Sequence, residues 1–153
     1  MRSLGKLFTV DMYGCKFDVL NNSEFIRGAM ETAIQDANMT LLNLTCQRLE
    51  SEGLTALALL TESHMSIHTN PKLGYAAIDI FTLSEHCHPE RAVLALRKIL
   101  KPDKTKTTQI FRGDFGSQKD MKPRIRISIA PMRRVKNTGA KVLRFLRRNS
   151  RGN

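Results

Sequence analysis

Apolar residues recur along the chain with two different periods, which divide it into strands and helices. Segments typical of strands, alternating or short and apolar, occupy residues 6–13, 40–48, 54–60, 61–69, 75–82, 105–112 and 124–129. Stripes of helical period predict one helix that begins at Asn22 or Ser23 and runs to Ala37, and a second that begins at His88-Pro89 and ends at Lys101-Pro102. This order predicts an α+β two-layer sandwich, a mainly antiparallel sheet with helices on one face.

Two of these strands should differ in their contact with solvent. Residues 54–60, Leu-Thr-Ala-Leu-Ala-Leu-Leu, are almost continuously apolar, which predicts a central strand buried on both faces. Residues 124–129, Arg-Ile-Arg-Ile-Ser-Ile, alternate cleanly and follow a polar loop at 113–123. They predict an outer strand with one solvent-exposed face.

The composition is that of one globular domain. A chain of 153 residues, 41% of them hydrophobic, can bury a core without disulfides or a structural metal. No apolar run approaches the roughly 20 residues that a membrane span needs, and residues 1–6 show no signal peptide. Cys15, Cys46 and Cys87 are odd in number and form no CxxC pair, which favours free thiols. We therefore expect a cytoplasmic protein.

Most of the net charge of +11 lies at the C-terminus. Residues 132–153 contain eight Lys and Arg residues and no acid, which leaves +3 for the rest of the chain. We expect a domain of residues 1–131 followed by a basic tail of residues 132–153. The tail is either a solvated terminus or a basic amphipathic helix from Thr138 that contacts RNA, anionic lipid or an acidic partner. Phe145 is its sole aromatic residue, so the charge alone is weak evidence for nucleic acid.

The segment 61–69, Thr-Glu-Ser-His-Met-Ser-Ile-His-Thr, concentrates the groups that can do chemistry. In an extended chain its alternation places His64, Ser66 and His68 on one side and Met65 and Ile67 on the other. One face of this strand should be polar and the other buried.

The four histidines of the chain form two close pairs, which raises the question of a metal. His64 and His68 form one pair, and His86 and His88 form the other, with Cys87 between them. No spacing here matches a zinc motif. We therefore expect no metal site. The alternative to a metal site is that these histidines are ordinary polar side chains on an accessible sheet face.

A third interpretation starts from Glu62-Ser63, with His68 nearby in the sequence. A serine hydroxyl can attack its own preceding carbonyl if the peptide is strained and a base is at hand, which turns the amide into an ester. Elimination then breaks the chain and leaves a dehydroalanine that hydrolyses to a pyruvoyl group. Such a ketone can form a Schiff base with an amine substrate and act as an electron sink.

Residues 60–69, Leu-Thr-Glu-Ser-His-Met-Ser-Ile-His-Thr, followed by 74–82, Gly-Tyr-Ala-Ala-Ile-Asp-Ile-Phe-Thr, carry a family resemblance. The sequence resembles the prokaryotic S-adenosylmethionine decarboxylases of polyamine biosynthesis. The likeness extends to Gly14, the Pro89 helix and Lys101-Pro102, and so covers about residues 4–112.

The resemblance implies a pyruvoyl enzyme made by self-cleavage between Glu62 and Ser63. A β chain of residues 1–62 would separate from an α chain that begins with pyruvoyl at position 63. His68 matches the family's processing histidine, and Thr55 falls where the family usually has a serine that assists processing. The resemblance also implies a homodimer with active sites near its interface.

Three departures from the family concern the substrate. Leu83 stands where the family has a cysteine that returns a proton to the decarboxylated carbon, and Cys87 is a candidate replacement. Asn70 and Leu49 stand where the family has aromatic residues that look like the clamp on the adenine ring.

Losing both aromatics should weaken adenosyl binding by roughly one to two powers of ten. We therefore expect a relative that decarboxylates L-arginine or L-ornithine, with Glu85 or Asp79 meeting the cationic side chain and Asn70 a further candidate for substrate contact. Two alternatives stay open. One is S-adenosylmethionine decarboxylase itself, with Cys87 or water as the proton source, and the other is a non-catalytic regulatory homologue.

Overall fold

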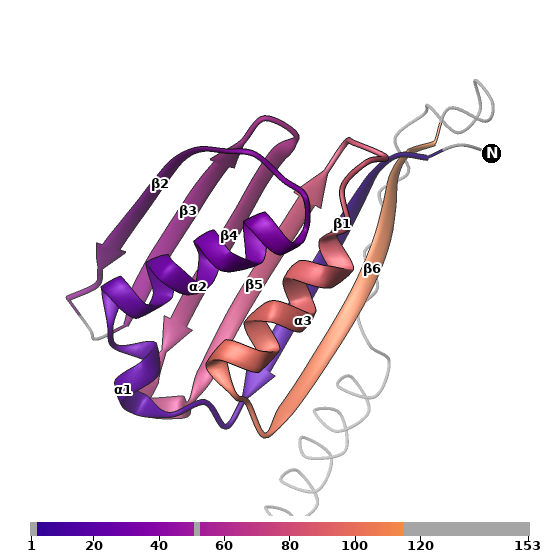
Figure 1. Ribbon diagram of the computed structural model, residues 1–153. Helices are drawn as coiled ribbons and strands as arrows, with labels where there is room; N and C mark the ends of the chain where they lie inside the picture. Colours follow the sequence, from indigo (N-terminus) through magenta and orange to yellow (C-terminus); the bar gives the residue numbers. More distant parts are fainter. Residues whose placement is uncertain (1–2, 51–52, 115–153) are drawn as a thin grey trace, which may run out of the picture. The chain divides into compact units, whose positions relative to one another are not determined.

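Six strands form one antiparallel sheet in the computed structural model, which describes residues 3–50 and 53–114 (Figure 1). Their order across the sheet is β2-β3-β4-β5-β1-β6. Their bounds are β1 Ser3–Tyr13, β2 Leu41–Arg48, β3 Leu54–Leu60, β4 Ser63–Asn70, β5 Tyr75–Thr82 and β6 Lys104–Asp114. The two longer helices lie on one face of this sheet, so the predicted α+β sandwich is confirmed.

Local capping explains where the helices begin and end. The longer helices are α2, Ser23–Asp36, and α3, Pro89–Leu100, and the short ones are α1, Phe17–Leu20, and the 3-10 helix η1, Pro71–Leu73. Asn22 is the N-cap of α2, and its side chain accepts a hydrogen bond from the backbone N–H of Phe25 at 3.0 Å. Helix α3 has Pro89 in its first turn, where no backbone N–H is needed. Helix α1 is not predicted from the sequence, because four residues are too few to show a helical period.

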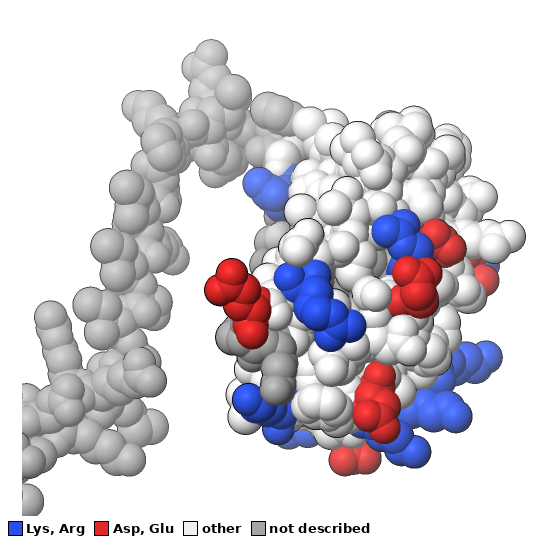
Figure 2. Space-filling view, turned by 90° about the vertical axis from the view of Figure 1, so that its left-hand side faces the viewer, with Lys and Arg blue, Asp and Glu red and all other residues white. Residues whose placement is uncertain are grey.

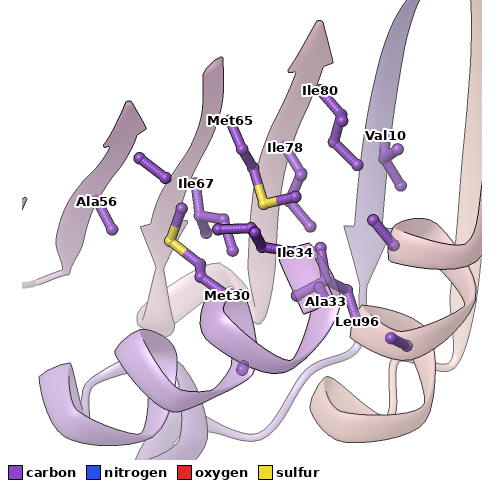
Figure 3. Close-up of a cluster of buried hydrophobic side chains, with 14 of the residues drawn as sticks. Val10, Met30, Ala33, Ile34, Ala56, Met65, Ile67, Ile78, Ile80 and Leu96 are labelled. Carbon is purple, nitrogen blue, oxygen red and sulfur yellow. The ribbon is translucent and has the colours of Figure 1, made fainter. Parts of the chain in front are cut away.

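The hydrophobic core fills the space between the helices and the sheet (Figure 3). Alternate side chains of the strands point toward the helices, and these are the apolar ones. The core side chains labelled in Figure 3 are Val10, Ala56, Met65, Ile67, Ile78 and Ile80 from the strands and Met30, Ala33, Ile34 and Leu96 from the helices. Met65 and Ile67 are fully buried, as the alternation of residues 61–69 predicted.

The prediction that strand 54–60 is buried on both faces is wrong. Burial alternates along β3: Ala56 and Ala58 are buried, whereas Leu57 and Leu59 are 54% and 56% exposed. Both helices cover the same face of the sheet, so nothing in the described chain covers Leu57 and Leu59. An apolar run cannot by itself distinguish a strand covered on two faces from one covered on one.

The sheet face opposite α2 and α3, here called the open face, carries most of the polar motif. By register and alternation it presents Thr55, Leu57 and Leu59 of β3, His64, Ser66 and His68 of β4, Asp79 and Phe81 of β5, Gly5 and Asp11 of β1 and Ile110 and Arg112 of β6. His64 and His68 are exposed on it, as predicted. The alternation predicts Ser66 on this polar face too, but it is buried at 7% exposure, because it lies in the middle of a strand with a neighbouring strand on each side.

Several predictions fall outside the described residues: the strand at 124–129, the domain boundary at 131 and the tail at 132–153 with its helix from Thr138. Within residues 3–50 and 53–114, no helix is long and apolar enough to cross a membrane. Acidic and basic side chains are interspersed on the side of the molecule in Figure 2. This agrees with the small net charge of the chain outside the tail.

Candidate active site

A two-residue turn joins β3 to β4 and contains the predicted cleavage site. Leu60 pairs with Ser63, which leaves Thr61 and Glu62 as the turn. The Thr61 N–H donates to the carbonyl of Thr40 at 3.0 Å, and the Thr40 N–H donates to the Glu62 carboxylate at 3.0 Å. These two bonds tie the turn to the residue before β2, so the Glu62-Ser63 peptide bond is held at one end of the sheet.

The carbonyl oxygen of Glu62 accepts a hydrogen bond from the backbone N–H of Leu83 at 3.1 Å. Leu83 directly follows β5, whose last residue, Thr82, pairs with Ser63. A donor on this oxygen polarises the carbonyl and stabilises negative charge on the oxygen if a nucleophile adds to the carbon. The donor is a backbone group, so a leucine supplies it as well as a cysteine does.

Ser63 has the backbone conformation and the contact expected of a strained nucleophile. Its φ of 152° is one that residues with side chains rarely adopt, and such conformations typically cost about 1–3 kcal/mol. Its Oγ lies 3.1 Å from Nδ1 of His64. A strained peptide, a polarised carbonyl, a hydroxyl and an imidazole thus meet at one bond, and they fit the formation of a pyruvoyl group from Ser63.

His64 is a functional candidate that the sequence pattern alone does not identify. Its ring packs against the ring of Phe81, with centroids 5.6 Å apart, and the guanidinium of Arg112 lies 4.8 Å from the Phe81 centroid. The signal that points to His64 in the sequence is its position next to Ser63. The predicted base was His68, five residues further along the strand.

Thr55 and His68 lie side by side but far from Ser63 of the same chain. They pair across β3 and β4, and Thr55 Oγ1 lies 3.1 Å from His68 Nδ1. Five residues of strand separate His68 from Ser63, about 17 Å at roughly 3.3 Å per residue. The structure therefore joins the two predicted processing residues to each other and separates them from the serine within one chain.

Asn70 and Leu49, the departures at the predicted adenine clamp, also lie at the end of the sheet remote from Ser63. Asn70 closes β4, about 23 Å from Ser63 by the same rise, and its side chain accepts from the Leu73 N–H at 3.2 Å as the cap of η1. Leu49 is exposed after β2, with its N–H bonded to the carbonyl of Gly53. The predicted clamp and the predicted cofactor therefore belong to opposite ends of one chain.

The remaining substrate candidates lie nearer to Ser63. Asp79 is half-buried on the open face and pairs with Ser66 of β4. Glu85 is exposed in the loop between β5 and α3. Leu83 is 57% exposed, and its side chain lies over Gly5, 3.0 Å from the position that a Cβ would take there.

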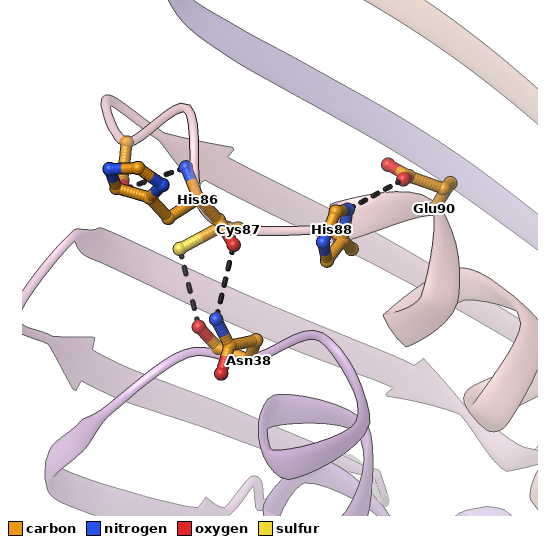
Figure 4. Close-up of polar contacts among 6 residues, drawn as sticks. Asn38, His86, Cys87, His88 and Glu90 are labelled. Atoms are coloured by element: carbon orange, nitrogen blue, oxygen red, sulfur yellow. Dashed lines mark hydrogen bonds and ion pairs between the residues drawn. The ribbon is translucent and has the colours of Figure 1, made fainter.

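Cys87 contacts the end of the helical layer rather than the cleavage site (Figure 4). It is 3% exposed, and its thiol donates to the carbonyl of Asn38, just after α2, at 3.4 Å. The Asn38 side chain in turn donates to the carbonyl of His86 at 3.1 Å. These contacts fix the loop before α3 and do not support Cys87 as a proton donor.

His88 in the same loop forms an ion pair with Glu90 at 3.4 Å. The described residues contain no group of three or more His, Cys, Asp or Glu side chains that could hold a metal ion. The zinc interpretation of the two histidine pairs therefore has no support in the described part of the chain.

Comparison with known proteins agrees with this geometry. Residues 6–113 match a family described as S-adenosylmethionine decarboxylase. A protein from Methanococcus maripaludis is 38% identical over 122 residues, covering 78% of this chain and 100% of its own, and one from Brevibacillus brevis is 36% identical over 125 residues, covering 82% and 93%. Both are named S-adenosylmethionine decarboxylase proenzyme. The crystal structure of the adenosylmethionine decarboxylase from Aquifex aeolicus is 30% identical, with a TM-score of 0.71, and covers 77% of this chain and 98% of its own.

The fold and the family match thus define a pyruvoyl-dependent carboxy-lyase, a decarboxylase that makes its cofactor from one of its own serines by self-cleavage. The chain belongs to the S-adenosylmethionine decarboxylase family of polyamine biosynthesis. The comparisons give no support to arginine or ornithine as the substrate, and they favour the alternative, S-adenosylmethionine.

Proposed function

We propose that the protein decarboxylates S-adenosylmethionine, which supplies the aminopropyl donor for spermidine, after it has cleaved itself between Glu62 and Ser63. The observation that carries the proposal is the hydrogen bond from the Leu83 N–H to the Glu62 carbonyl, next to a strained serine. The names shared by relatives that align over nearly their whole length support the substrate.

Self-cleavage begins when Ser63 Oγ adds to the carbonyl carbon of Glu62. The new C–O bond replaces the C–N bond, so the peptide becomes an ester and Ser63 gains a free amine. The Leu83 N–H stabilises the charge that develops on the Glu62 oxygen, and breaking the peptide bond relieves the strain at Ser63. Elimination of the ester then separates residues 1–62 from the chain that begins at 63.

The pyruvoyl group supplies a carbonyl that withdraws electrons from a bound amine substrate as carbon dioxide leaves. The proton that replaces the carboxylate comes from water in this proposal. Leu83 has no proton to give, and the Cys87 thiol is engaged with Asn38. Leu83 is exposed in the single chain, so its own fold does not shield this end of the sheet from water.

We also propose that the active form is a homodimer in which the open faces of two copies pack together. Thr55 and His68 lie about 17 Å from Ser63 of their own chain. A two-fold related copy with its β4 running in the opposite direction brings the Thr55–His68 pair of one chain to Ser63 of the other. The exposed Leu57 and Leu59 supply apolar surface for this contact. Leu49 and Asn70 of one copy then meet the substrate held at Ser63 of the other.

Complementation tests the dimer. Ser63→Ala and His68→Ala chains, each with its own tag, are expressed separately and together. The His68→Ala chain keeps its serine, so it is expected to cleave when the Ser63→Ala chain supplies His68 and to cleave poorly alone. Cleavage of the His68→Ala chain to the same extent in both cases would remove His68 of the second copy from processing.

Three assays test the function itself. Mass analysis after a denaturing gel is expected to show two chains for the native protein and one intact chain for Ser63→Ala. Carbon dioxide release is then measured from S-adenosylmethionine, L-arginine and L-ornithine side by side. Turnover of an amino acid without turnover of S-adenosylmethionine would overturn the substrate proposal. An intact native chain with an ordinary serine at 63 would overturn the pyruvoyl mechanism and leave the regulatory homologue.

We propose a cytoplasmic location and a dispensable tail. Cys15, Cys46 and Cys87 are all free, which suits a reducing compartment. The family match ends at residue 113, so residues 132–153 lie outside it. Deleting residues 132–153 is expected to leave turnover unchanged, and lost turnover would make the tail part of the enzyme. Cell fractionation followed by immunodetection checks the location.

A further inference from the structure

The hydroxyl of Ser63 has one described side-chain partner, and it is the imidazole of His64. Nδ1 lies 3.1 Å from Oγ, within hydrogen-bonding distance. His68, which the family resemblance implies in processing, belongs to the far end of the strand. The self-cleavage mechanism therefore still needs a base that accepts the proton of the Ser63 hydroxyl.

The ring of His64 is held from one side by a stack that crosses the open face. His64 pairs with Phe81 of β5, and the two rings are in contact. On β1 the register partner of Phe81 is Leu7, and Gly5 lies two residues further along the same face. A Cβ at Gly5 would lie 2.8 Å from the Phe81 ring, so the ring occupies space that any other residue would fill. Arg112, the partner of Gly5 on β6, reaches over the glycine and places its guanidinium on Phe81.

We propose that His64 is the general base of self-cleavage and that Phe81 and Arg112 are positioning residues for it, an inference that rests on the proposed function. Nδ1 takes the proton of Ser63 as Oγ bonds to the Glu62 carbonyl carbon. The oxygen of that carbonyl carries the negative charge beside the Leu83 N–H. When the C–N bond breaks, the imidazolium returns the proton to the Ser63 nitrogen. The step is an isomerisation, so it needs no co-reactant.

This assignment divides the proton transfers between two histidines. His64 serves the hydroxyl proton of its own chain, because Nδ1 is already in contact with Oγ. The Thr55–His68 pair of a second copy is left for the Cα proton that is lost in the elimination. The first step then needs one chain, and the second needs two.

The test is the rate of cleavage of newly translated chains of a His64→Asn variant. The amide oxygen of asparagine can accept a hydrogen bond from Ser63 but cannot take its proton. Cleavage is expected to slow by about 100-fold or more, the usual contribution of a general base. Added imidazole should restore part of the rate. The native rate should fall toward acid pH, because a protonated imidazole accepts no proton, and the variant should lose this dependence.

Two further variants make the result decisive. His86→Asn is the matched control, because His86 is exposed and its described hydrogen bonds are made by its backbone. It is expected to cleave at the native rate. Phe81→Leu keeps the base but loosens its ring, so cleavage should slow by about tenfold with the pH dependence retained. If His64→Asn does not fold, the cleavage rate of Phe81→Leu still tests whether the position of the His64 ring matters for cleavage.

Cleavage of His64→Asn at the native rate, or Phe81→Leu cleaving as fast as the native chain, would overturn the role of His64 and leave Ser63 as the nucleophile. A native chain that does not cleave would instead overturn the proposed function.

Discussion

The backbone N–H of Leu83 donates to the carbonyl oxygen of Glu62 at 3.1 Å, which ties the residue after β5 to the bond that is proposed to break. The family resemblance assigns position 83 a role through its side chain. The structure adds a role through its backbone. A substitution at position 83 changes the side chain and keeps the backbone N–H, so it tests the side-chain role separately from the backbone role.

Leu83→Cys is expected to cleave at the native rate, because the backbone donor is unchanged. Its decarboxylation rate should rise by about tenfold or more, since a thiol adds a general acid where the native chain relies on water. Leu83→Ala serves as the control and should cleave without the gain. The measurement is carbon dioxide release per cleaved chain. A Leu83→Cys rate equal to that of Leu83→Ala would show that position 83 does not reach the reacting carbon.

Replacement of Ser63 by glycine should stabilise the uncleaved chain relative to replacement by alanine. Both variants lack the hydroxyl, but glycine adopts a φ of 152° without the cost that a side chain incurs. The larger backbone entropy of glycine in the unfolded chain offsets part of this gain. The free energy of unfolding of Ser63→Gly should still exceed that of Ser63→Ala by about 1 kcal/mol. Denaturant unfolding of both variants measures it.

Ser66 in the same strand provides the control for this comparison. It has ordinary extended geometry, so Ser66→Gly should be less stable than Ser66→Ala. The same order at both positions would mean that Ser63 is not strained in the folded chain.

Alkaline stability should depend on the pair Tyr75 and Asp11. The Tyr75 hydroxyl donates to Asp11 Oδ1 at 2.5 Å. This hydrogen bond, with burial and the charge of Asp11, raises the pKa of Tyr75 from 10.0 to about 12. Between these values the folded chain keeps a proton that the unfolded chain releases, so the free energy of unfolding falls as the pH rises through this window.

Asp11→Ala should lower the pKa of Tyr75 and reduce this fall, and Tyr75→Phe should abolish the contribution. Ultraviolet titration of the phenolate, with unfolding measured across the same window, checks both. A Tyr75 pKa unchanged in Asp11→Ala would assign the shift to burial and to the charges of Tyr13 and Asp79.

Leu49→Phe should tighten the binding of S-adenosylmethionine. An aromatic ring at this position restores half of the clamp that the family resemblance implies and is worth on the order of 1 kcal/mol. KM should fall several-fold with kcat little changed. Leu94→Phe, on the exposed side of α3, is the control for a general effect of added aromatic surface. Equal KM values for the two variants would contradict a contact between position 49 and the adenosyl group.

The sequence predicts the elements well because each has a local cause. Alternation located the six described strands to within about three residues, and Asn22 and Pro89 marked the helix starts. Other features have no local signal. The position of β1 between β5 and β6 is determined by tertiary packing and not by local sequence. The exposure of Leu57 and Leu59 depends on which face of the sheet the helices cover.

The candidate site was predictable only in part for the same reason. The sequence singles out Ser63, but the donor to Glu62 is a backbone group, which carries no residue signature. His68 is close to Ser63 in the sequence and shares a face with His64 by alternation, yet it lies five residues further along β4 than Ser63. A shared face fixes direction and says nothing of distance along a strand.

The length of β4 has a consequence for when the enzyme appears. If the second proton transfer requires a neighbour, activation becomes a bimolecular event whose rate depends on how much chain has been made. Newly synthesised chains would remain uncleaved at low protein concentration and would cleave faster as their concentration rises. The pyruvoyl group would then form only in chains that have already dimerised, so every active site that carries the cofactor would belong to an assembled dimer.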